Sequence, residues 1–171
     1  SYCALCDGAF FKDKTVAVVG SGNSALEEAL YLTKLCKKII MLNRSEKFKG
    51  SQILFEKLKS SHNVEFLYQT QVIALHGNEE KLTGLEIMKE NRTSTLPIDG
   101  LFVYIGSVPN TSFLINTGVE LDHNFIVVDQ NMRTNIDGIY ACGDCVKKDV
   151  YQLTTAVGDG ATAATTAEKE A

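Results

Sequence analysis

The clearest hydrophobic pattern in the chain lies between residues 15 and 43. A run of apolar residues at 16–19 is typical of a short buried strand, and a segment with helical spacing follows it. In that segment apolar side chains recur on one face, while Glu27 and Glu28 are expected on the outward face. A second strand-like run at 38–43 completes the unit. We therefore predict an α/β fold with a Rossmann-like, doubly wound parallel sheet.

Short strands dominate the middle of the chain. Residues 52–60 have the spacing of a helix, and four strand-like runs follow, separated by turn residues such as Gly77 and Asn78. These runs cover residues 64–68, 71–75, 82–89 and 94–98. Short strands in succession predict an antiparallel meander laid across the parallel sheet. A last apolar run at 101–105 is typical of a central strand.

Gly106 and Pro109 interrupt this pattern, and we expect a domain boundary there. Residues 1–108 would form one domain, and residues 109–171 would be the C-terminal segment of another. The second part is expected to contain two short strands and a final helix rich in small residues, at 125–128, 138–141 and 151–168.

The loop after the first strand reads Gly-Ser-Gly-Asn-Ser-Ala at 20–25 and fits the pattern G-x-G-x-x-G/A. In this pattern Gly20 turns the chain, Gly22 lets the backbone approach a pyrophosphate, and Ala25 lets the helix pack closely on the strand. The N-terminus of the helix directs its free N–H groups at the phosphates. The strand before the loop and the helix after it favour a dinucleotide site over a plain tight turn.

The end of the second strand carries the residues that distinguish one pyridine nucleotide from the other. An acid at this position usually binds the ribose 2′-hydroxyl of NAD, whereas arginine accommodates the 2′-phosphate of NADP. Asn43 and Arg44 stand there, with Lys47 and Lys49 nearby and Glu46 opposing them in charge. The loop therefore favours NADPH, and a solvated basic loop without this role is the alternative.

Four of the five cysteines stand in two C-x-x-C pairs. In a cytosolic protein such pairs are more often redox or metal centres than structural bridges. Cys3 and Cys6 are expected to be a redox dithiol, with Asp7 placed to exchange a proton with a departing thiolate. A zinc site that joins this pair to Cys142 and Cys145 is the alternative, but the two pairs lie too far apart in sequence for a compact zinc ribbon.

The composition limits what else the chain does. Its 171 residues, 44% of them hydrophobic, suffice for one core, or for one domain and a piece of another. The net charge of −4 argues against a nucleic-acid surface and against a polybasic membrane surface. No apolar run is long enough to span a bilayer and no secretory signal opens the chain, so a cytoplasmic protein is expected. The reactive pair lies so close to Ser1 that we expect a fragment of a longer chain.

Taken together, these motifs resemble the low-molecular-weight thioredoxin reductases, a family of pyridine nucleotide-disulfide oxidoreductases. The likeness rests on Cys-Ala-Leu-Cys-Asp-Gly at 3–8, the glycine loop at 20–25 with Glu-Glu-Ala at 27–29, Gly106 with Pro109-Asn110, and Gly-Ile-Tyr-Ala-Cys-Gly-Asp at 138–144. It covers essentially the whole chain, and several motifs in the right order are more specific than any one of them. The resemblance implies FAD and NADPH as cofactors, a thioredoxin as partner, and a homodimer.

The resemblance also implies a role for each candidate residue. Cys6 would lie against the flavin and take electrons from it, Cys3 would exchange with the substrate disulfide, and Asp7 would act as acid and base. The residues implied in cofactor binding are Gly20, Gly22, Asn23, Ser24 and Ala25 at the pyrophosphate, Asn43, Arg44 and Lys49 in the 2′-phosphate loop, Gly106 in its motif, and Gly143, Asp144 and Gln152 at FAD.

The chain departs from the family in three respects, one of which is Tyr151, which stands where the family commonly has an arginine before Gln152. Asn43, Ser45 and Lys49 replace a histidine and two arginines, so one guanidinium remains in the loop and the preference for NADPH is weaker. The family also has a separate N-terminal glycine motif that binds FAD, and no second such motif occurs here. The chain is therefore expected to lack the N-terminal half of the FAD-binding domain.

The activity expected of the parent protein is transfer of electrons from NADPH through FAD to the Cys3/Cys6 dithiol and on to thioredoxin. One alternative is the flavoprotein component of an alkyl hydroperoxide reductase system. Another is a nucleotide-binding module that is inactive without the missing FAD half. The intact glycine loop argues against a reductase fed by ferredoxin, because such an enzyme has no need of a pyridine nucleotide.

Overall fold

The computed structural model describes residues 1–171, which divide into two compact units. The first unit is Ser1–Gly106 and the second is Ser107–Ala171. Each unit has a hydrophobic core of its own. The glycine loop and the first cysteine pair both belong to the first unit.

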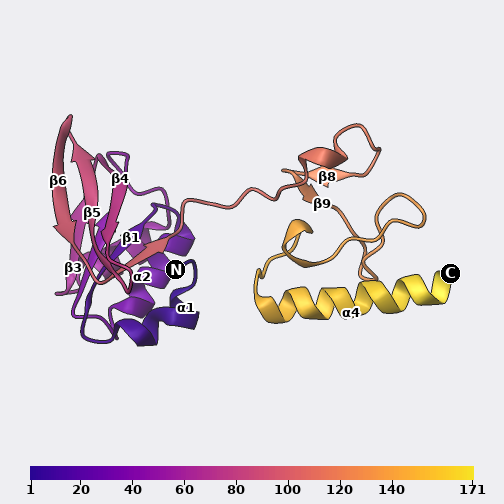
Figure 1. Cartoon of the computed structure of the whole chain (residues 1–171), viewed down its shortest axis with the longest axis horizontal. Helices are drawn as coiled ribbons and strands as arrows, with labels where there is room; N and C mark the ends of the chain where they lie inside the picture. The colour runs from indigo at the N-terminus through magenta and orange to yellow at the C-terminus, as the bar shows by residue number, and fades with distance from the viewer. The chain divides into compact units, whose positions relative to one another are not determined.

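The first unit is built on a parallel sheet of four strands (Figure 1). The strands are β1 (Thr15–Val19), β2 (Lys38–Leu42), β3 (Val64–Leu67) and β7 (Gly100–Val103), in the order β3-β2-β1-β7. Helix α2 (Asn23–Leu32) connects β1 to β2, and helix α3 (Gln52–Lys59) connects β2 to β3. Both helices lie where the hydrophobic spacing predicts them, and the α/β fold with a parallel sheet is confirmed.

Between β3 and β7 the chain forms an antiparallel sheet of β4 (Thr70–Gly77), β5 (Leu82–Lys89) and β6 (Arg92–Pro97), with β5 in the centre. The predicted meander is therefore present, but the run at 64–68 does not belong to it. Val64 pairs with Ile39 in the parallel sheet. A short apolar run gives no signal for the direction of its partner, and here helix α3 returns the chain parallel to β2.

Side chains of the central strand alternate between the two faces of the parallel sheet. Val16 and Val18 of β1 are buried in one cluster with residues of α2 and α3. Ala17 is buried in a second cluster with Leu85 and Ile87 of β5. The parallel sheet thus has helices on one face and the antiparallel strands on the other.

The prediction of a central strand at 101–105 is wrong, because β7 lies at the edge of the sheet. Its outer edge is covered by the beginning of the chain. The Ser1 amino group donates a hydrogen bond to the Leu101 carbonyl at 2.7 Å, and the Val103 N–H donates to the Ser1 carbonyl at 3.0 Å. These bonds satisfy backbone groups that an edge strand otherwise exposes, which accounts for the apolar sequence of β7.

Two short helices precede β1 and complete the first unit. They are α1 (Ala4–Asp7) and the 3₁₀ helix η1 (Gly8–Phe11). Ala4 and Gly8 are buried, and the Phe11 ring meets the Phe102 ring edge to face, with 5.3 Å between centroids. The segment that carries the first cysteine pair is therefore anchored on both sides of the cysteines.

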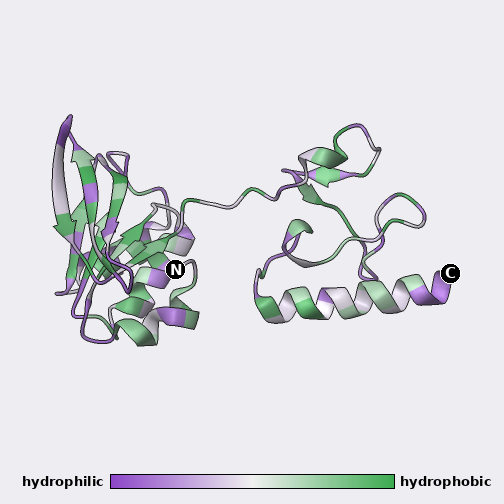
Figure 2. Ribbon diagram, in the orientation of Figure 1, coloured by the Kyte–Doolittle hydropathy of each residue, from purple (hydrophilic) through white to green (hydrophobic).

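The second unit contains little regular structure before its last helix. Its elements are η2 (Ser112–Leu114), β8 (Leu121–Asp122), β9 (Phe125–Ile126), η3 (Gly143–Cys145) and α4 (Leu153–Glu170). A small core of Val119, Ile126 and Val146 holds them together. Along α4 the residues change from apolar near its beginning to hydrophilic at its end (Figure 2). No helix in the chain combines the length and the apolar character that a membrane span requires.

The strand predicted at 138–141 is absent. Gly138 has a φ of +77°, which interrupts an extended conformation. Tyr140 forms one isolated antiparallel bridge with Arg133.

Replacement of Leu85 by alanine tests the packing of the two sheets against each other. Leu85 is completely buried between them, so Leu85→Ala is expected to lower the free energy of unfolding by about 2–5 kcal/mol. Leu75 is its partner across β4 and β5 but is 61% exposed, so Leu75→Ala should cost less than about 1 kcal/mol. Urea unfolding followed by circular dichroism measures both, and equal losses would contradict this packing.

Candidate functional site

A cleft of about 780 Å³ opens at the carboxyl ends of β1, β2 and β7. This is the edge at which open α/β sheets bind ligands. Seven residues predicted from the sequence line it, namely Gly20, Gly22, Ser24, Asn43, Arg44, Lys49 and Gly106. Asn23 and Ala25 do not line it. Asn23 is hydrogen-bonded to the Ser51 N–H, and Ala25 is completely buried in the core.

Two glycines of the loop are needed for different reasons. Gly20 has a φ of +146°, and a Cβ built there would lie 2.4 Å from the Tyr104 carbonyl oxygen, so no other residue fits. A Cβ on Gly22 would meet nothing within 4 Å, so the space beside Gly22 is open toward the cleft. Gly20 is thus required by the protein itself, while Gly22 leaves room for a ligand.

The N-terminus of α2 faces this space without a side-chain cap. Its N-cap residue is Gly22, and its first turn contains no acidic residue. The Asn23 carboxamide oxygen accepts a hydrogen bond from the Ser51 N–H at 2.7 Å, which ties the following loop to the helix. The N–H groups and the partial positive charge of the helix end therefore favour an anion in the cleft.

The loop after β2 presents two cations. Arg44 and Lys49 are exposed, and neither side chain makes a hydrogen bond or an ion pair. Asn43 is only 3% exposed, and its carboxamide donates to the Lys47 carbonyl at 2.8 Å and accepts from the Ser45 N–H at 3.0 Å. Asn43 thus shapes the turn that presents Arg44.

Cys3 and Cys6 form a disulfide, with their Cα atoms 5.3 Å apart. Cys3 is the N-cap of α1, and its Sγ accepts a hydrogen bond from the Cys6 N–H at 3.1 Å. Cys6 is exposed, and Cys3 is half-buried. The Asp7 carboxylate accepts a hydrogen bond from the Ser1 hydroxyl at 2.6 Å. The chain contains no group of three or more metal-binding side chains.

Glu28 holds the disulfide segment in place, and the prediction that it faces outward is wrong. Its carboxylate accepts hydrogen bonds from the N–H groups of Ala4 at 2.7 Å and Leu5 at 3.3 Å, which are orphan donors of α1. The Tyr104 hydroxyl joins them, donating to Glu28 at 3.1 Å and accepting from Ala4 at 2.8 Å. Burial, and then the charge of Glu28, raise the pKa of Tyr104 well above its usual range, so the hydroxyl remains a donor.

Sequence reasoning missed Glu28 and Tyr104, although a signal for the first exists. Glu28 directly precedes the buried Ala29 and stands three residues after the buried Ala25, so it lies at the margin of the buried face of α2. Nothing in the sequence around Tyr104 indicates its partner, because Ala4 stands far away in the chain.

In the second unit the candidate residues gather around the beginning of α4. Gln152 is the N-cap of α4 and forms a capping box with Thr155. Gly143 has a φ of +81°, and its N–H donates to the Asp159 carboxylate at 3.3 Å. The Asp144 carboxylate is 66% exposed and lies 3.7 Å from the Lys148 ammonium, which binds Asp159 more closely, at 2.7 Å.

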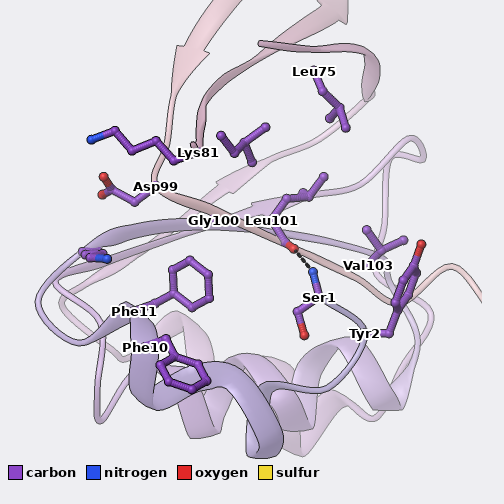
Figure 3. A pocket seen from close by; sticks show the side chains of 12 residues that line it. Ser1, Tyr2, Phe10, Phe11, Leu75, Lys81, Asp99, Gly100, Leu101 and Val103 are labelled. Atoms are coloured by element: carbon purple, nitrogen blue, oxygen red, sulfur yellow. Dashed lines mark hydrogen bonds between the residues drawn. The ribbon is translucent and has the colours of Figure 1, made fainter. Parts of the chain in front are cut away.

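A second hollow, of about 570 Å³, lies between the beginning of the chain and the antiparallel sheet (Figure 3). Phe10, Phe11 and Leu75 line it, and the hydrogen bond from Ser1 to Leu101 crosses one wall. None of the residues predicted to bind a cofactor or react lies there.

A family model described as pyridine nucleotide-disulphide oxidoreductase matches residues 1–160. The chain belongs to this family. Among pyridine nucleotide-disulphide oxidoreductases it is 41% identical over 171 residues to a thioredoxin reductase from Listeria monocytogenes, covering 99% of the chain and 54% of that protein. It is 44% identical over 166 residues to one from Mycoplasma genitalium, covering 95% of the chain and 52% of that protein. The chain spans about half the length of the curated relatives it matches.

A solved structure of the family supports the fold. The crystal structure of thioredoxin reductase from Streptococcus pyogenes matches with a TM-score of 0.88 and 37% identity, over 99% of this chain and 56% of that one. The likeness to a second, from Giardia duodenalis, has a TM-score of 0.82 and 35% identity. The low-molecular-weight thioredoxin reductase resemblance inferred from the sequence is thus confirmed.

The two glycines of this pyridine nucleotide-disulphide oxidoreductase should respond differently to substitution. Gly20→Ala places a Cβ against the Tyr104 carbonyl at a strained φ, and should lower the free energy of unfolding by about 1–3 kcal/mol. Gly22→Ala meets no neighbour at an ordinary φ of −85°, and should change stability by less than about 1 kcal/mol. Urea unfolding of both variants measures the difference. A Gly20→Ala variant as stable as the unmodified chain would refute the close approach of Gly20 to the Tyr104 carbonyl.

Proposed function

We propose that this chain carries the pyridine-nucleotide cleft and the redox disulfide of a thioredoxin reductase. The protein takes electrons from NADPH, passes them through FAD to the Cys3–Cys6 disulfide, and delivers them to thioredoxin. The observation that carries this proposal is that one helix serves both places. The N-terminus of α2 opens on the cleft, and Glu28, on the same helix, holds the segment that bears the disulfide. The names of the relatives support thioredoxin as the partner.

The cleft fits a pyridine nucleotide at both of its charged groups. The open space beside Gly22 and the uncapped end of α2 suit the pyrophosphate. Arg44 and Lys49 are unpaired cations at the end of β2, where a 2′-phosphate lies in NADP sites. Arg44 offers a planar fork to that phosphate, whereas Lys49 offers a point charge.

In the second unit, Gly143, Asp144 and Gln152 are the residues proposed to hold FAD. The exposed Asp144 carboxylate has only a distant ion pair and is free to accept hydrogen bonds from a ligand. Leu153 and Val157, in the first two turns of α4, are exposed apolar side chains that a flat ring could cover. FAD, when bound, supplies a relay that accepts a hydride from NADPH and passes an electron pair to a disulfide.

Reduction of the Cys3–Cys6 disulfide adds two electrons and two protons and gives two thiols. The N-terminus of α1 and the Cys6 N–H stabilise negative charge on the Cys3 sulfur, so Cys3 is proposed to attack the thioredoxin disulfide. Cys6 then attacks the Cys3 sulfur of the mixed disulfide and releases reduced thioredoxin. Asp7, adjacent to Cys6, is proposed to exchange the proton of the departing thiol.

Arg44→Ala tests the nucleotide preference. Loss of a charge-assisted contact of about 1.5–3 kcal/mol should weaken NADPH binding by at least about tenfold and leave NADH binding unchanged. Lys47→Ala is the matched control, because Lys47 is exposed in the same loop but does not line the cleft. Calorimetric titration with each nucleotide measures the affinities. Equal loss for both nucleotides would exclude a 2′-phosphate contact, and no binding of either would exclude the cleft as a pyridine-nucleotide site.

Thiol exchange with thioredoxin tests the second half of the proposal without any need for FAD. The chain is reduced, freed of reductant and mixed with oxidised thioredoxin, and thiols on thioredoxin are counted by mass spectrometry after alkylation. In a chain carrying Cys142→Ser and Cys145→Ser, so that Cys3 and Cys6 are the one C-x-x-C pair, about one equivalent of thioredoxin should be reduced, and Cys3→Ser should abolish the transfer because the attacking sulfur is gone. Cys36→Ser should retain it, because Cys36 is buried and takes no part in the disulfide.

The partner in the same experiment decides between the two flavoprotein functions. Reduction of an oxidised peroxiredoxin, with thioredoxin left unreduced, would replace thioredoxin reductase by the flavoprotein component of an alkyl hydroperoxide reductase system. If the chain reduces neither partner, the remaining interpretation is a nucleotide-binding module.

A further inference from the structure

The second cysteine pair shares with the first an extended N-cap cysteine and a second cysteine in the helical turn that follows. Cys3 is an extended N-cap, with φ −148° and ψ 103°, and Cys6 is the third residue of the short helix that follows. Cys142 is likewise an extended N-cap, with φ −150° and ψ 167°, and Cys145 is the third residue of η3. The first pair shows that an extended N-cap and one helical turn bring two cysteines to a Cα separation of 5.3 Å, which suits a disulfide.

The Cys145 sulfur of the second pair turns back toward the backbone of Cys142. The Cys145 thiol donates a hydrogen bond to the Cys142 carbonyl at 3.2 Å, so its sulfur points back at the first cysteine. Cys142 is exposed, and Cys145 is half-buried against the core of the second unit. Gly143 stands between them at a positive φ, so the turn can tighten without the strain that a side chain there would add.

We propose that Cys142 and Cys145 are a second dithiol, which closes to an intrachain disulfide on contact with a small-molecule disulfide such as glutathione disulfide. This goes beyond the proposed function, which uses Cys3 and Cys6 alone. It concerns a modification site in the second unit and does not depend on thioredoxin or on a bound cofactor.

The exchange proceeds in two balanced steps. The exposed Cys142 thiolate attacks glutathione disulfide, forms a mixed disulfide and releases one glutathione thiolate. Cys145 then loses its proton and attacks the Cys142 sulfur, which forms the intrachain bond and releases the second glutathione. The pair is oxidised by two electrons, one glutathione disulfide is reduced to two thiols, and the two cysteine protons pass to them.

Burial raises the pKa of the Cys145 thiol, which assigns the order of attack. A raised pKa leaves less thiolate near neutral pH, so Cys145 is the slower nucleophile and resolves the mixed disulfide. The second step should therefore accelerate as the pH rises.

Closure of the ring would act on a charged network. Asp144 lies between the two cysteines, and the Gly143 N–H is bonded to Asp159, which also binds Lys148. A disulfide from Cys142 to Cys145 fixes Gly143 and Asp144 in a ring. The oxidation state of the pair thus sets how freely the Asp144 carboxylate moves.

The experiment uses the full chain with Cys3→Ser and Cys6→Ser, so that only Cys36, Cys142 and Cys145 remain. Cys36 serves as an internal reference, because burial raises the pKa of its thiol to about 11 and keeps it protonated. The reduced protein is equilibrated in glutathione buffers of increasing oxidised fraction, then denatured, alkylated with N-ethylmaleimide and weighed. Circular dichroism confirms that each variant is folded.

The expected product carries one maleimide, lacks two hydrogen atoms and has no glutathione attached. With Cys145→Ser added, the expected product is a stable glutathione adduct on Cys142, since nothing resolves it. The unmodified chain provides a second measurement, because trypsin cleavage after Arg133 and Lys147 leaves both cysteines in one peptide. That peptide should contain its own disulfide.

Two results would overturn the proposal. One is an adduct of glutathione that persists on Cys142 while Cys145 remains alkylatable. The other is three maleimides at glutathione ratios that fully oxidise Cys3 and Cys6 in the unmodified chain. Either would show that the turn at Gly143 does not bring the sulfurs into bonding distance.

Discussion

The close approach of the Gly20 and Tyr104 backbones, just beyond the ends of the paired strands β1 and β7, is the constraint on which the first unit depends. The Tyr104 carbonyl occupies the place where a side chain on Gly20 would stand, and the Tyr104 N–H bonds to the Val19 carbonyl at 2.7 Å. This close approach ends both strands at the same edge, turns the chain into α2, and leaves the cleft open beside Gly22. The same backbone contact fixes the position of the Tyr104 Cα, and the Tyr104 hydroxyl accepts a hydrogen bond from the Ala4 N–H in α1. One backbone contact therefore positions both the cleft and the disulfide segment.

Helix α2 makes the cleft and the disulfide segment parts of one rigid arrangement. Its first turn offers uncapped N–H groups to the cleft, and one turn later Glu28 satisfies the orphan donors of a second helix, α1. The Glu28 carboxylate, which lies at the N-terminus of α1, also affects the charge that the cysteine sulfur atoms can carry. Its negative charge disfavours a thiolate on the nearby sulfur atoms, whereas the N-terminus of α1 and the Cys6 N–H favour a thiolate on Cys3. The reactivity of Cys3 is set by the balance of these opposing contributions.

The parts of the structure that follow local rules could be predicted from the sequence, and the parts that depend on distant partners could not. Hydrophobic spacing located α2, α3 and α4, and the glycine pattern located Gly20, Gly22 and Ser24 among the residues that line the cleft. The same spacing placed Glu28 outside, because its partners in α1 are unrelated to the period of its own helix. The apolar run of β7 suggested a central strand, since the cover that Ser1 provides is a long-range contact. The direction of β3 was missed because a four-residue strand does not encode its partner.

The two C-x-x-C turns have the same spacing, but their sulfur atoms have different surroundings and therefore different reactivity. In the first turn a sulfur accepts from an N–H, which favours the thiolate at Cys3. In the second turn the Cys145 side chain packs against the core, and this burial raises the pKa of its thiol. Both proposals therefore assign the attack to the N-cap residue, for different reasons: to Cys3 because negative charge on its sulfur is stabilised, and to Cys142 because its partner Cys145 holds its proton. The residue type and the spacing are equal, so this difference follows from the surroundings of each sulfur: an N–H donor at Cys3 and burial at Cys145.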